Sequence, residues 1–308
     1  RFAMYAHDDH VIDNLRRAKK LTTPERIVAF RAQFHEEFLQ EEKTWNADQT
    51  VLVSSEQMSR LHVDSAQRRL FDLLAETGRR VRVIIYLRAQ HEAIVSEYSQ
   101  FIKGGKTTTL EHEIALASDR KMYRYAQTVR SWANVFGAEN LIVRPYERRQ
   151  LKDADVVADY MHIVGLGDLH GGTMPKEQNQ SLDVATIEYL RLLNIHFPRW
   201  AATGAGRNIA REGLAEAIEA ISDGRKPRLG GAEAAAFMSN FAEDNALVAR
   251  EFLGREDGRL FLGDPAETAG APIEELTIER SLEITARLWR HMSAQRANQP
   301  DPVPAKAT

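Results

Sequence analysis

The spacing of apolar residues predicts a chain rich in helices. After Thr23 and Pro24, four apolar side chains recur every three or four residues and share one face of a helix: Ile27, Phe30, Phe34 and Phe38. Thr23 and Pro24 suit the start of that helix, because a Thr hydroxyl caps the first turn and Pro fits the first helical position. Similar patterns predict helices over much of 1–43, from about 59 to a stop at Gly78, and over 91–102, 121–136, 153–164, 184–194, 232–252 and 278–295.

Three short apolar runs between these helices predict buried β-strands. They are Thr50–Val53, Val81–Leu87 and Leu141–Val143. Strands that alternate with helices indicate an α/β fold, in which helices cover a parallel sheet. We expect one domain over 1–296, with the stretch 197–231, rich in Gly, Ala and Arg, as an insertion. The Pro-rich residues 297–308 have nothing to bury, and we expect a disordered tail there.

The composition narrows the classes of function. The 41 basic and 44 acidic residues give a formal net charge of −3, which argues against a dedicated nucleic-acid binder, since such proteins usually carry a basic excess. The absence of cysteine excludes disulfides, thiolate metal sites and a cysteine nucleophile. No run approaches the roughly 20 apolar residues that cross a bilayer. We therefore expect a cytoplasmic protein with no membrane span and no nucleic-acid partner.

Polar groups stand at the carboxyl end of each predicted strand, where open parallel sheets bind their ligands. The first strand ends in Ser54-Ser55-Glu56, the second in Arg88 and the third in Arg144-Pro145-Tyr146. Ser96 follows Arg88 by eight positions, in the next predicted helix. An arginine offers a phosphate a forked, permanently charged donor, and a serine about two turns into the helix can add a hydroxyl. The alternative is a surface salt bridge for Arg88 and a packing role for Ser96.

The sequence around these two residues resembles a known family. The segment Val83–Phe101 reads Val-Ile-Ile-Tyr-Leu-Arg-Ala-Gln-His-Glu-Ala-Ile-Val-Ser-Glu-Tyr-Ser-Gln-Phe, and it resembles the 3′-phosphate-binding segment of P-loop sulfotransferases. In that family a strand ends in an Arg, and a Ser follows eight positions later, often beside an aromatic residue. Four other stretches are similar in order and character: 51–56, 141–147, the helix end 164–166 and the turn 179–182 before the helix at 184–194.

The resemblance implies both a fold and an activity. The fold is a three-layer, P-loop NTPase-like parallel sheet flanked by helices, with a helical C-terminal part. The activity is transfer of a sulfuryl group from PAPS (3′-phosphoadenosine 5′-phosphosulfate) to a hydroxyl or amine of a carbohydrate or other small molecule, with no metal. Arg88 and Ser96 would bind the 3′-phosphate of PAPS and its product PAP, and Ser54 and Ser55 would also contact the cosubstrate.

One part of the family pattern is absent from the sequence. Members begin with a strand, a Lys-Thr-Gly-Thr-Thr-like loop and a helix, and this loop wraps the 5′-phosphosulfate with backbone N–H groups and a Lys. The chain contains no such loop and no G-x4-G-K-[ST] motif. The segment 104–109, Gly-Gly-Lys-Thr-Thr-Thr, follows a helix rather than a strand, so we expect a helix stop and a connecting loop there. Because residue 1 is Arg rather than Met, we expect the natural protein to extend upstream; a phosphosulfate loop there would restore the enzyme, and its absence would favour a binding role.

Sulfuryl transfer also needs a base that takes the acceptor's proton. Glu56 stands at a predicted strand end, and His7 and His10 are three residues apart in a predicted helix, on one face. A solvated or capping role for Glu56, and a metal pair or plain surface positions for the two histidines, are the alternatives. We expect Glu56 or His7 to be the base, with no metal site.

Five further cations stand in loops and have two interpretations. They are Lys103, Lys106, Arg225, Lys226 and Arg228. Each can meet an anionic nucleotide, acceptor or glycan, or can lie in water.

Two other functions are compatible with the pattern. A P-loop kinase would need a Walker loop and an Asp at a strand end, whereas the predicted strand ends carry Ser54, Arg88 and Arg144. A non-catalytic nucleotide- or glycan-binding protein would need no donor loop at all.

Overall fold

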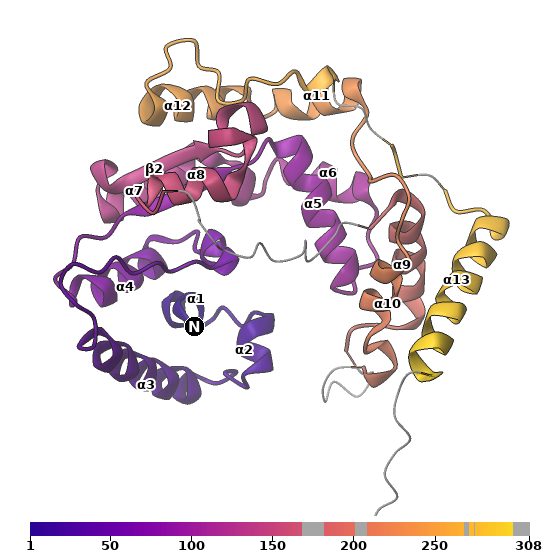
Figure 1. The fold of residues 1–308 in the computed structure, drawn as a ribbon, viewed down its shortest axis with the longest axis horizontal. Helices are drawn as coiled ribbons and strands as arrows, with labels where there is room; N and C mark the ends of the chain where they lie inside the picture. The colour runs from indigo at the N-terminus through magenta and orange to yellow at the C-terminus, as the bar shows by residue number, and fades with distance from the viewer. Residues whose placement is uncertain (168–181, 201–207, 268–270, 274, 298–308) are drawn as a thin grey trace, which may run out of the picture. The chain divides into compact units, whose positions relative to one another are not determined.

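The computed structural model of the chain describes residues 1–167, 182–200, 208–267, 271–273 and 275–297. These residues form two compact units, each assembled from separate stretches of the chain. The first unit comprises Arg1–Leu87, Asp119–Tyr146 and Phe241–Phe261, and the second comprises Arg88–Ser118, Glu147–Asn240 and Leu262–Thr308. Both units consist mainly of helices (Figure 1).

The first unit contains a short parallel sheet and six helices among the residues that the structure describes. In this sheet β1 (Val83–Leu87) pairs with β2 (Leu141–Pro145), so that Ile85 lies opposite Val143. The helices of the unit are α1 (Phe2–Ala6), α2 (Asn14–Ala18), α3 (Pro24–Glu42), α4 (Asp64–Ala75), α7 (Tyr125–Phe136) and α12 (Ala242–Leu253). Short 3₁₀ turns cover Glu56–Arg60, Lys121–Tyr123 and Ala138–Asn140.

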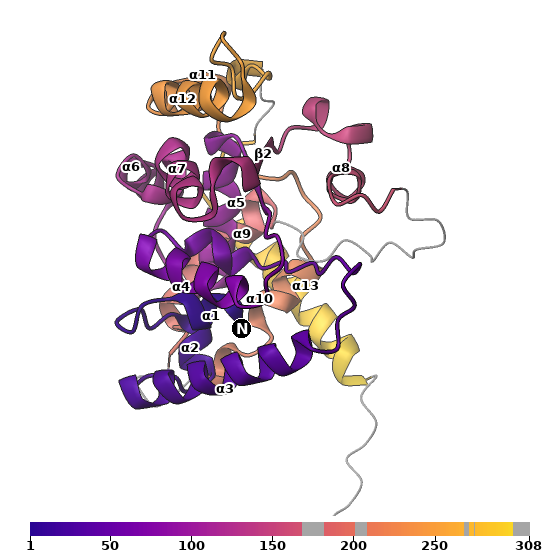
Figure 2. The same ribbon diagram turned by 90° about the vertical axis from the view of Figure 1, so that its left-hand side faces the viewer.

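Apolar side chains join these elements into a continuous core. Val129 of α7 and Val248 of α12 are fully buried together with Val143 of β2. In both views of the ribbon α1 lies between α3 and α4 (Figure 1 and Figure 2). Its Phe2 ring packs edge-on against Phe34 of α3, with 5.2 Å between the ring centroids. The helical spacing of the phenylalanines in α3 therefore has the buried role that the sequence predicts.

The prediction of a three-layer parallel sheet is wrong. Among the described residues the sheet has two strands, β1 and β2, and Thr50–Val53 forms no strand. The three apolar side chains of this run, Val51, Leu52 and Val53, are 40%, 43% and 41% exposed. An apolar, β-branched run has the local preference for a strand, but a strand also needs a neighbour for its N–H and C=O groups. The structure provides no such neighbour for Thr50–Val53, and helices form most of the remainder.

The second unit is built around α5. Its helices are α5 (Gln90–Lys103), α6 (Leu110–Ala117), α8 (Val156–Ile163), α9 (Val184–His196), α10 (Leu214–Ala220), α11 (Gly231–Ser239) and α13 (Ile278–Ala297). Short 3₁₀ turns cover Arg148–Gln150, Lys152–Ala154, Ile209–Arg211 and Pro265–Glu267. α5 contacts α6, α9 and α11, while α9, α10 and α13 lie side by side (Figure 2).

A buried aspartate fixes the start of α9. The Asp183 carboxylate is 1% exposed and accepts hydrogen bonds from the backbone N–H groups of Ala185 (3.0 Å) and Thr186 (2.9 Å). It also accepts from Ser222 Oγ at 2.9 Å and from Gly224 N at 3.2 Å. Burial acts to raise the pKa of Asp183, but these hydrogen bonds outweigh burial and hold the pKa below its ordinary value. Ser222 and Gly224 belong to the stretch 197–231, which the sequence predicts to be an insertion. The C-terminal part of this stretch is therefore hydrogen-bonded to the residue that caps the start of α9.

Most of the predicted helices are confirmed. Thr23 caps α3, with its Oγ1 3.5 Å from the backbone N of Arg26, and Pro24 is the first helical residue. The predicted helix 232–252 is interrupted, because α11 ends at Ser239 and α12 begins at Ala242. The turn residues 179–181 and the tail residues 298–308 lie outside the described residues.

Candidate functional site

The start of α5 is the first candidate region. Arg88 directly follows the last residue of β1, and α5 begins two residues later at Gln90. The N-cap residue is Ala89, which makes no side-chain cap hydrogen bond. A helix N-terminus carries partial positive charge from its backbone N–H groups and attracts anions. The first turn of α5 therefore suits a negatively charged ligand.

Arg88 forms an ion pair with Glu92. Its Nε donates to Glu92 Oε2 at 3.0 Å, and the two side chains are 41% and 43% exposed. This is the salt bridge that the sequence left open as an alternative. Glu92 and Ser96 are four residues apart in α5 and therefore share one helix face. The ion pair thus places the Arg88 guanidinium over the face that carries the half-buried Ser96.

A second arginine, Arg228, contributes positive charge to the same turn through its effect on His91. His91 is 6% exposed, and burial lowers its pKa. The charge of Glu92 raises the pKa of His91, whereas the charges of Arg88 and Arg228 lower it further. The backbone N of Arg228 donates to Ala271 O at 3.1 Å, which holds this exposed residue in place. Two arginine charges therefore act on His91 in the first turn of α5.

The serines and the glutamate after the predicted first strand lie at the surface. Ser54, Ser55 and Glu56 are exposed, and Glu56 begins a 3₁₀ turn whose first carbonyl accepts a hydrogen bond from Ser59 Oγ at 2.6 Å. Because Thr50–Val53 is not a strand, these residues do not stand at a sheet edge. The reason for assigning Ser54 and Ser55 to the cosubstrate is therefore lost.

His7 lies in a buried polar corner of the first unit. α1 ends at Ala6, so the prediction that His7 and His10 share a helical face is wrong. His7 is 5% exposed, and its Nε2 lies 3.9 Å from Asp13 Oδ2. Its backbone carbonyl accepts a hydrogen bond of 2.7 Å from Arg16, so the loop after α1 is fixed around it.

His62 lies near His7 and was missed by the sequence reasoning. Burial lowers the pKa of His62, and the charges of Lys121, Arg60 and His7 lower it further. Burial also lowers the pKa of His7, against the opposing effect of Asp13. Neutral imidazoles of this kind can accept a proton near neutral pH. The only sequence signal was the apolar residue on each side of His62.

The glycine-rich segment 104–109 is confirmed as a helix stop. Asn194 Nδ2 donates to the carbonyls of Ile102 (2.8 Å) and Lys106 (2.7 Å), and Arg211 donates to that of Lys103 (2.7 Å). These bonds satisfy carbonyls that the end of α5 leaves open. Gly105 has a φ of 100°, a conformation that favours glycine.

The two lysines of this segment have partners within the second unit. Lys103 Nζ lies 2.9 Å from Glu219 Oε2. Lys106 Nζ lies 3.5 Å from Glu113 Oε1 and 3.5 Å from the centre of the Phe101 ring. These contacts favour a structural role for both lysines.

The predicted site residues divide between the two units. Arg88 and Ser96 belong to the second unit, whereas His7, Ser54, Ser55 and Glu56 belong to the first. Within the described ranges, no three His, Asp or Glu side chains are arranged to hold a metal ion. No helix in the same ranges combines the length and the apolar character that a bilayer crossing requires.

No protein-family model, curated protein or solved structure matches the chain. The inference of function therefore rests on the residues themselves and on their geometry.

Proposed function

We propose that the protein is a PAPS-dependent sulfotransferase and that its second unit binds the 3′-phosphate of PAPS at the start of α5. The observation that supports this proposal is the position of Arg88 beside the first turn of that helix, where the charge of Arg228 also acts on His91. Guanidinium groups are the side chains best suited to a phosphate dianion, because they present paired N–H donors at fixed geometry. Ser96 adds a hydroxyl on the same face of α5.

The ion pair between Arg88 and Glu92 is compatible with phosphate binding. Both side chains are about two-fifths exposed, and such a pair contributes roughly 0–1 kcal/mol. A dianionic phosphate can therefore displace Glu92 from Arg88 at little cost. Glu92 itself opposes anion binding through its charge, so it weakens the site without blocking it.

The sequence offers two residues as candidate bases, His7 and Glu56, and both belong to the first unit. His7 is buried with a lowered pKa, whereas Glu56 is exposed. In the reaction, the acceptor oxygen or nitrogen attacks sulfur, the acceptor's proton passes to the base, and PAP leaves with the electrons of the broken S–O bond. The acceptor is a hydroxyl or amine of a carbohydrate or other small molecule. A chain without cysteine suits the reducing cytoplasm.

A kinase function is less well supported. Among the described residues, β1 is followed by Arg88 and β2 by Tyr146, and neither strand end carries the Asp that would hold Mg²⁺ beside a nucleotide. A non-catalytic protein that binds the same nucleotide would share the phosphate site and lack only the transfer step.

Calorimetric titration tests the proposal with PAP, adenosine 5′-phosphate and ATP. We expect PAP to bind at least about 10-fold more tightly than adenosine 5′-phosphate without Mg²⁺, because a charged hydrogen-bonded contact contributes roughly 1.5–3 kcal/mol. Arg88→Ala and Arg228→Ala should each remove most of this difference. Arg290→Ala, which removes an exposed arginine of α13, is the control and should leave it unchanged.

Three outcomes would change the assignment. Equal binding of the two adenosine nucleotides, or an unaltered preference in Arg88→Ala, would overturn the phosphate site. ATP binding that depends on Mg²⁺ would favour a kinase. PAP binding by the protein, without sulfuryl transfer from PAPS to a panel of hydroxyl and amine acceptors, would favour the non-catalytic binding protein.

A further inference from the structure

Helix α13 carries large apolar side chains on a surface that the second unit leaves exposed. Ile278, Leu282, Trp289 and Met292 of this helix are 76%, 64%, 65% and 37% exposed. Single apolar residues are common on protein surfaces, but a row of large ones along one helix marks a binding surface. These four side chains therefore form a candidate interface.

Another side of α13 anchors the helix within the second unit. Ile284 and Leu288 are buried, and the helix contacts α9 and α10 (Figure 1 and Figure 2). Arg287 donates a hydrogen bond to the carbonyl of Ile221 and forms an ion pair of 2.8 Å with Asp223. The packing of the unit therefore uses a different face of the helix from the exposed apolar residues.

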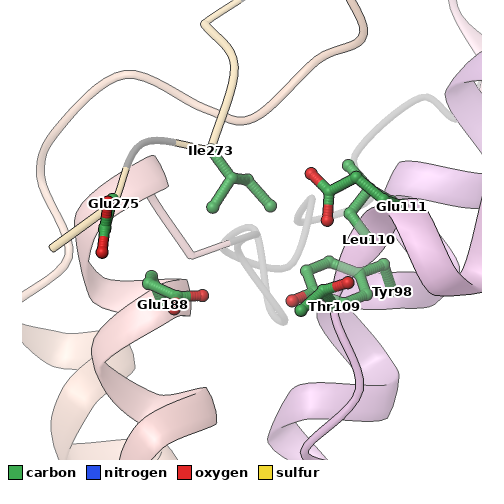
Figure 3. Close-up of a pocket in the computed structure, with 7 residues that line it drawn as sticks. All are labelled: Tyr98, Thr109, Leu110, Glu111, Glu188, Ile273 and Glu275. Carbon is green, nitrogen blue, oxygen red and sulfur yellow. The ribbon is translucent and has the colours of Figure 1, made fainter.

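Further contacts hold α13 in place. Glu275, three residues before the helix begins, lines a small pocket with Tyr98 of α5 and Glu188 of α9 (Figure 3). Tyr189 of α9 and Thr285 of α13 share a hydrogen bond, with 2.9 Å between their side-chain oxygens. A partner that docks on α13 therefore meets a surface that is already formed, which lowers the entropy lost on binding.

The spacing of the exposed residues fits a coiled coil. Alternate steps of four and three residues connect six positions, which we call the α13 stripe: Ile278, Leu282, Thr285, Trp289, Met292 and Arg296. Residues with this spacing form a seam along one side of a helix, and the seam is buried when a second helix of the same spacing packs against it. A second copy of α13 provides that spacing, so a second copy of the chain is the partner that fits the stripe.

The charges of α13 favour two copies that run in opposite directions. Arg280 and Glu283 form an ion pair of 2.8 Å within the helix and offset each other, so Glu279 gives the first turn a negative charge. Arg296 gives the last turn a positive charge, and its guanidinium lies 6.0 Å from the centre of the Trp289 ring. In an antiparallel pair Glu279 of one copy lies beside Arg296 of the other, whereas a parallel pair brings like charges together. Antiparallel helix dipoles add to this preference.

We propose that the protein forms a two-fold symmetric dimer in which the α13 stripes of two copies pack in antiparallel orientation. In the register that the spacing sets, Thr285 of one copy lies opposite Trp289 of the other, so a small side chain meets the largest. The same register places Leu282 opposite Met292, and the two-fold axis repeats each contact. The dimer does not depend on sulfuryl transfer, because no residue of the stripe belongs to the proposed phosphate site.

Sedimentation velocity of the intact chain tests the proposal. A single pair of helices forms a small interface, so we expect dimerisation at micromolar concentrations, where the sedimentation coefficient should rise toward that of a dimer. Leu282→Glu and Trp289→Ala should each weaken the dimer by about 10-fold or more. Val28→Glu places a charge at an apolar position of α3 that is 59% exposed, and it should leave the dimer unchanged.

Introduced cysteines test the orientation, because the chain contains none of its own. A disulfide requires Cα atoms within about 7 Å of each other. Under mild oxidation, an equimolar mixture of Leu282→Cys and Met292→Cys should form more linked dimer than either variant alone. Val28→Cys is the control for random collision and should form little linked dimer.

Several results would overturn the proposal. A chain that stays monomeric at these concentrations forms no such dimer, and binding of that monomer to vesicles of phosphatidylglycerol and phosphatidylcholine, lost in Trp289→Ala, would assign the stripe to a lipid surface. A dimer that remains in both Leu282→Glu and Trp289→Ala would use another interface. Linkage of Leu282→Cys alone that equals linkage in the mixture would exclude the antiparallel register. Failure of PAP to bind would leave this proposal intact, because dimerisation is measured separately.

Discussion

Arg88 Nε lies 3.0 Å from Oε2 of Glu92, and this ion pair holds the arginine over the face of α5 that carries Ser96. Glu92 thus has two opposite effects, since it orients the cation and also competes with any anion for it. Both side chains are well exposed, so the orienting effect is small.

Glu92→Gln should therefore tighten PAP binding by about 2- to 5-fold. The substitution removes the competing charge and keeps a side chain of the same size in the first turn of α5. Calorimetric titration measures the change, with Glu279→Gln as a control that removes the same charge elsewhere. Weaker PAP binding in Glu92→Gln would mean that the orientation of Arg88 matters more than the repulsion.

Arg16 should be among the residues most important for the stability of the first unit. Its side chain is fully buried, and it donates to the carbonyls of Met4 (2.7 Å), His7 (2.7 Å), Asp8 (2.6 Å) and Val11 (2.8 Å). Arg16→Met removes the donor that these carbonyls share, and we expect a loss of about 3 kcal/mol or more in the free energy of unfolding.

Arg17→Met is the matched control for that experiment. Arg17 is the next residue of α2, and its side chain is exposed. Its replacement should change the free energy of unfolding by less than about 0.5 kcal/mol. Similar effects of the two substitutions in urea unfolding would contradict the role of Arg16.

Two aspartates that cap helices should differ in importance. Asp155 accepts from Val157 N (2.8 Å) and Ala158 N (2.9 Å) at the exposed start of α8. Asp183 makes the equivalent pair of bonds for α9 and also binds Ser222 and Gly224. We expect Asp155→Ala to lower the free energy of unfolding by about 1 kcal/mol. Asp183→Ala should lower it clearly more, by about 3 kcal/mol. Equal losses in thermal or urea unfolding would show that the bonds to Ser222 and Gly224 contribute nothing.

Buried histidines should make the protein less stable in mild acid. The pKa values of His7, His62 and His91 are lowered in the folded chain, chiefly by burial. As the pH falls, the unfolded chain takes up these protons first. The contribution of the neutral histidines to the stability of the folded chain is therefore complete above their unfolded pKa of about 6.5. It is lost as the pH falls toward the folded pKa. Each pH unit that separates the folded pKa from the unfolded one corresponds to about 1.4 kcal/mol of stability.

Urea unfolding at pH 7, 6 and 5 measures this effect. The free energy of unfolding should fall over this range, and His62→Gln should reduce the fall. His112→Gln, an exposed position on α6, should leave it unchanged. A pH dependence that is the same in His62→Gln and in the unsubstituted protein would exclude His62 as a contributor.

The sequence predicted correctly those features of the fold that depend on residues a few positions apart in the chain. The apolar spacing in α3 predicted the buried positions of Ile27, Phe34 and Phe38, because helix formation and helix faces depend on residues a few positions apart. Pairing of strands depends on distant residues. The predicted strands Val81–Leu87 and Leu141–Val143 form as Val83–Leu87 and Leu141–Pro145 and lie in one parallel sheet, but Thr50–Val53 has a similar apolar, β-branched composition and lies outside it.

The candidate site also combines residues that the local sequence predicts with residues that only the fold brings into play. The position of Arg88 at the end of β1 could be predicted, since it depends on one strand and the helix after it. The effect of the Arg228 charge on His91 could not, because the two residues are 137 positions apart in the sequence and only the fold relates them. His62 likewise becomes a candidate only through its proximity to His7.

The exposed run Thr50–Val53 has a consequence for the colloidal behaviour of the protein. The stretch 49–55 is exposed throughout and contains no charge, no proline and no glycine, which are the features of segments that join into intermolecular β-structure. Asp48 and Glu56 flank it and act as charged gatekeepers against such association. Neutralising these two residues would promote fibrils in concentrated solution, whereas a lysine in place of Leu52 would suppress them.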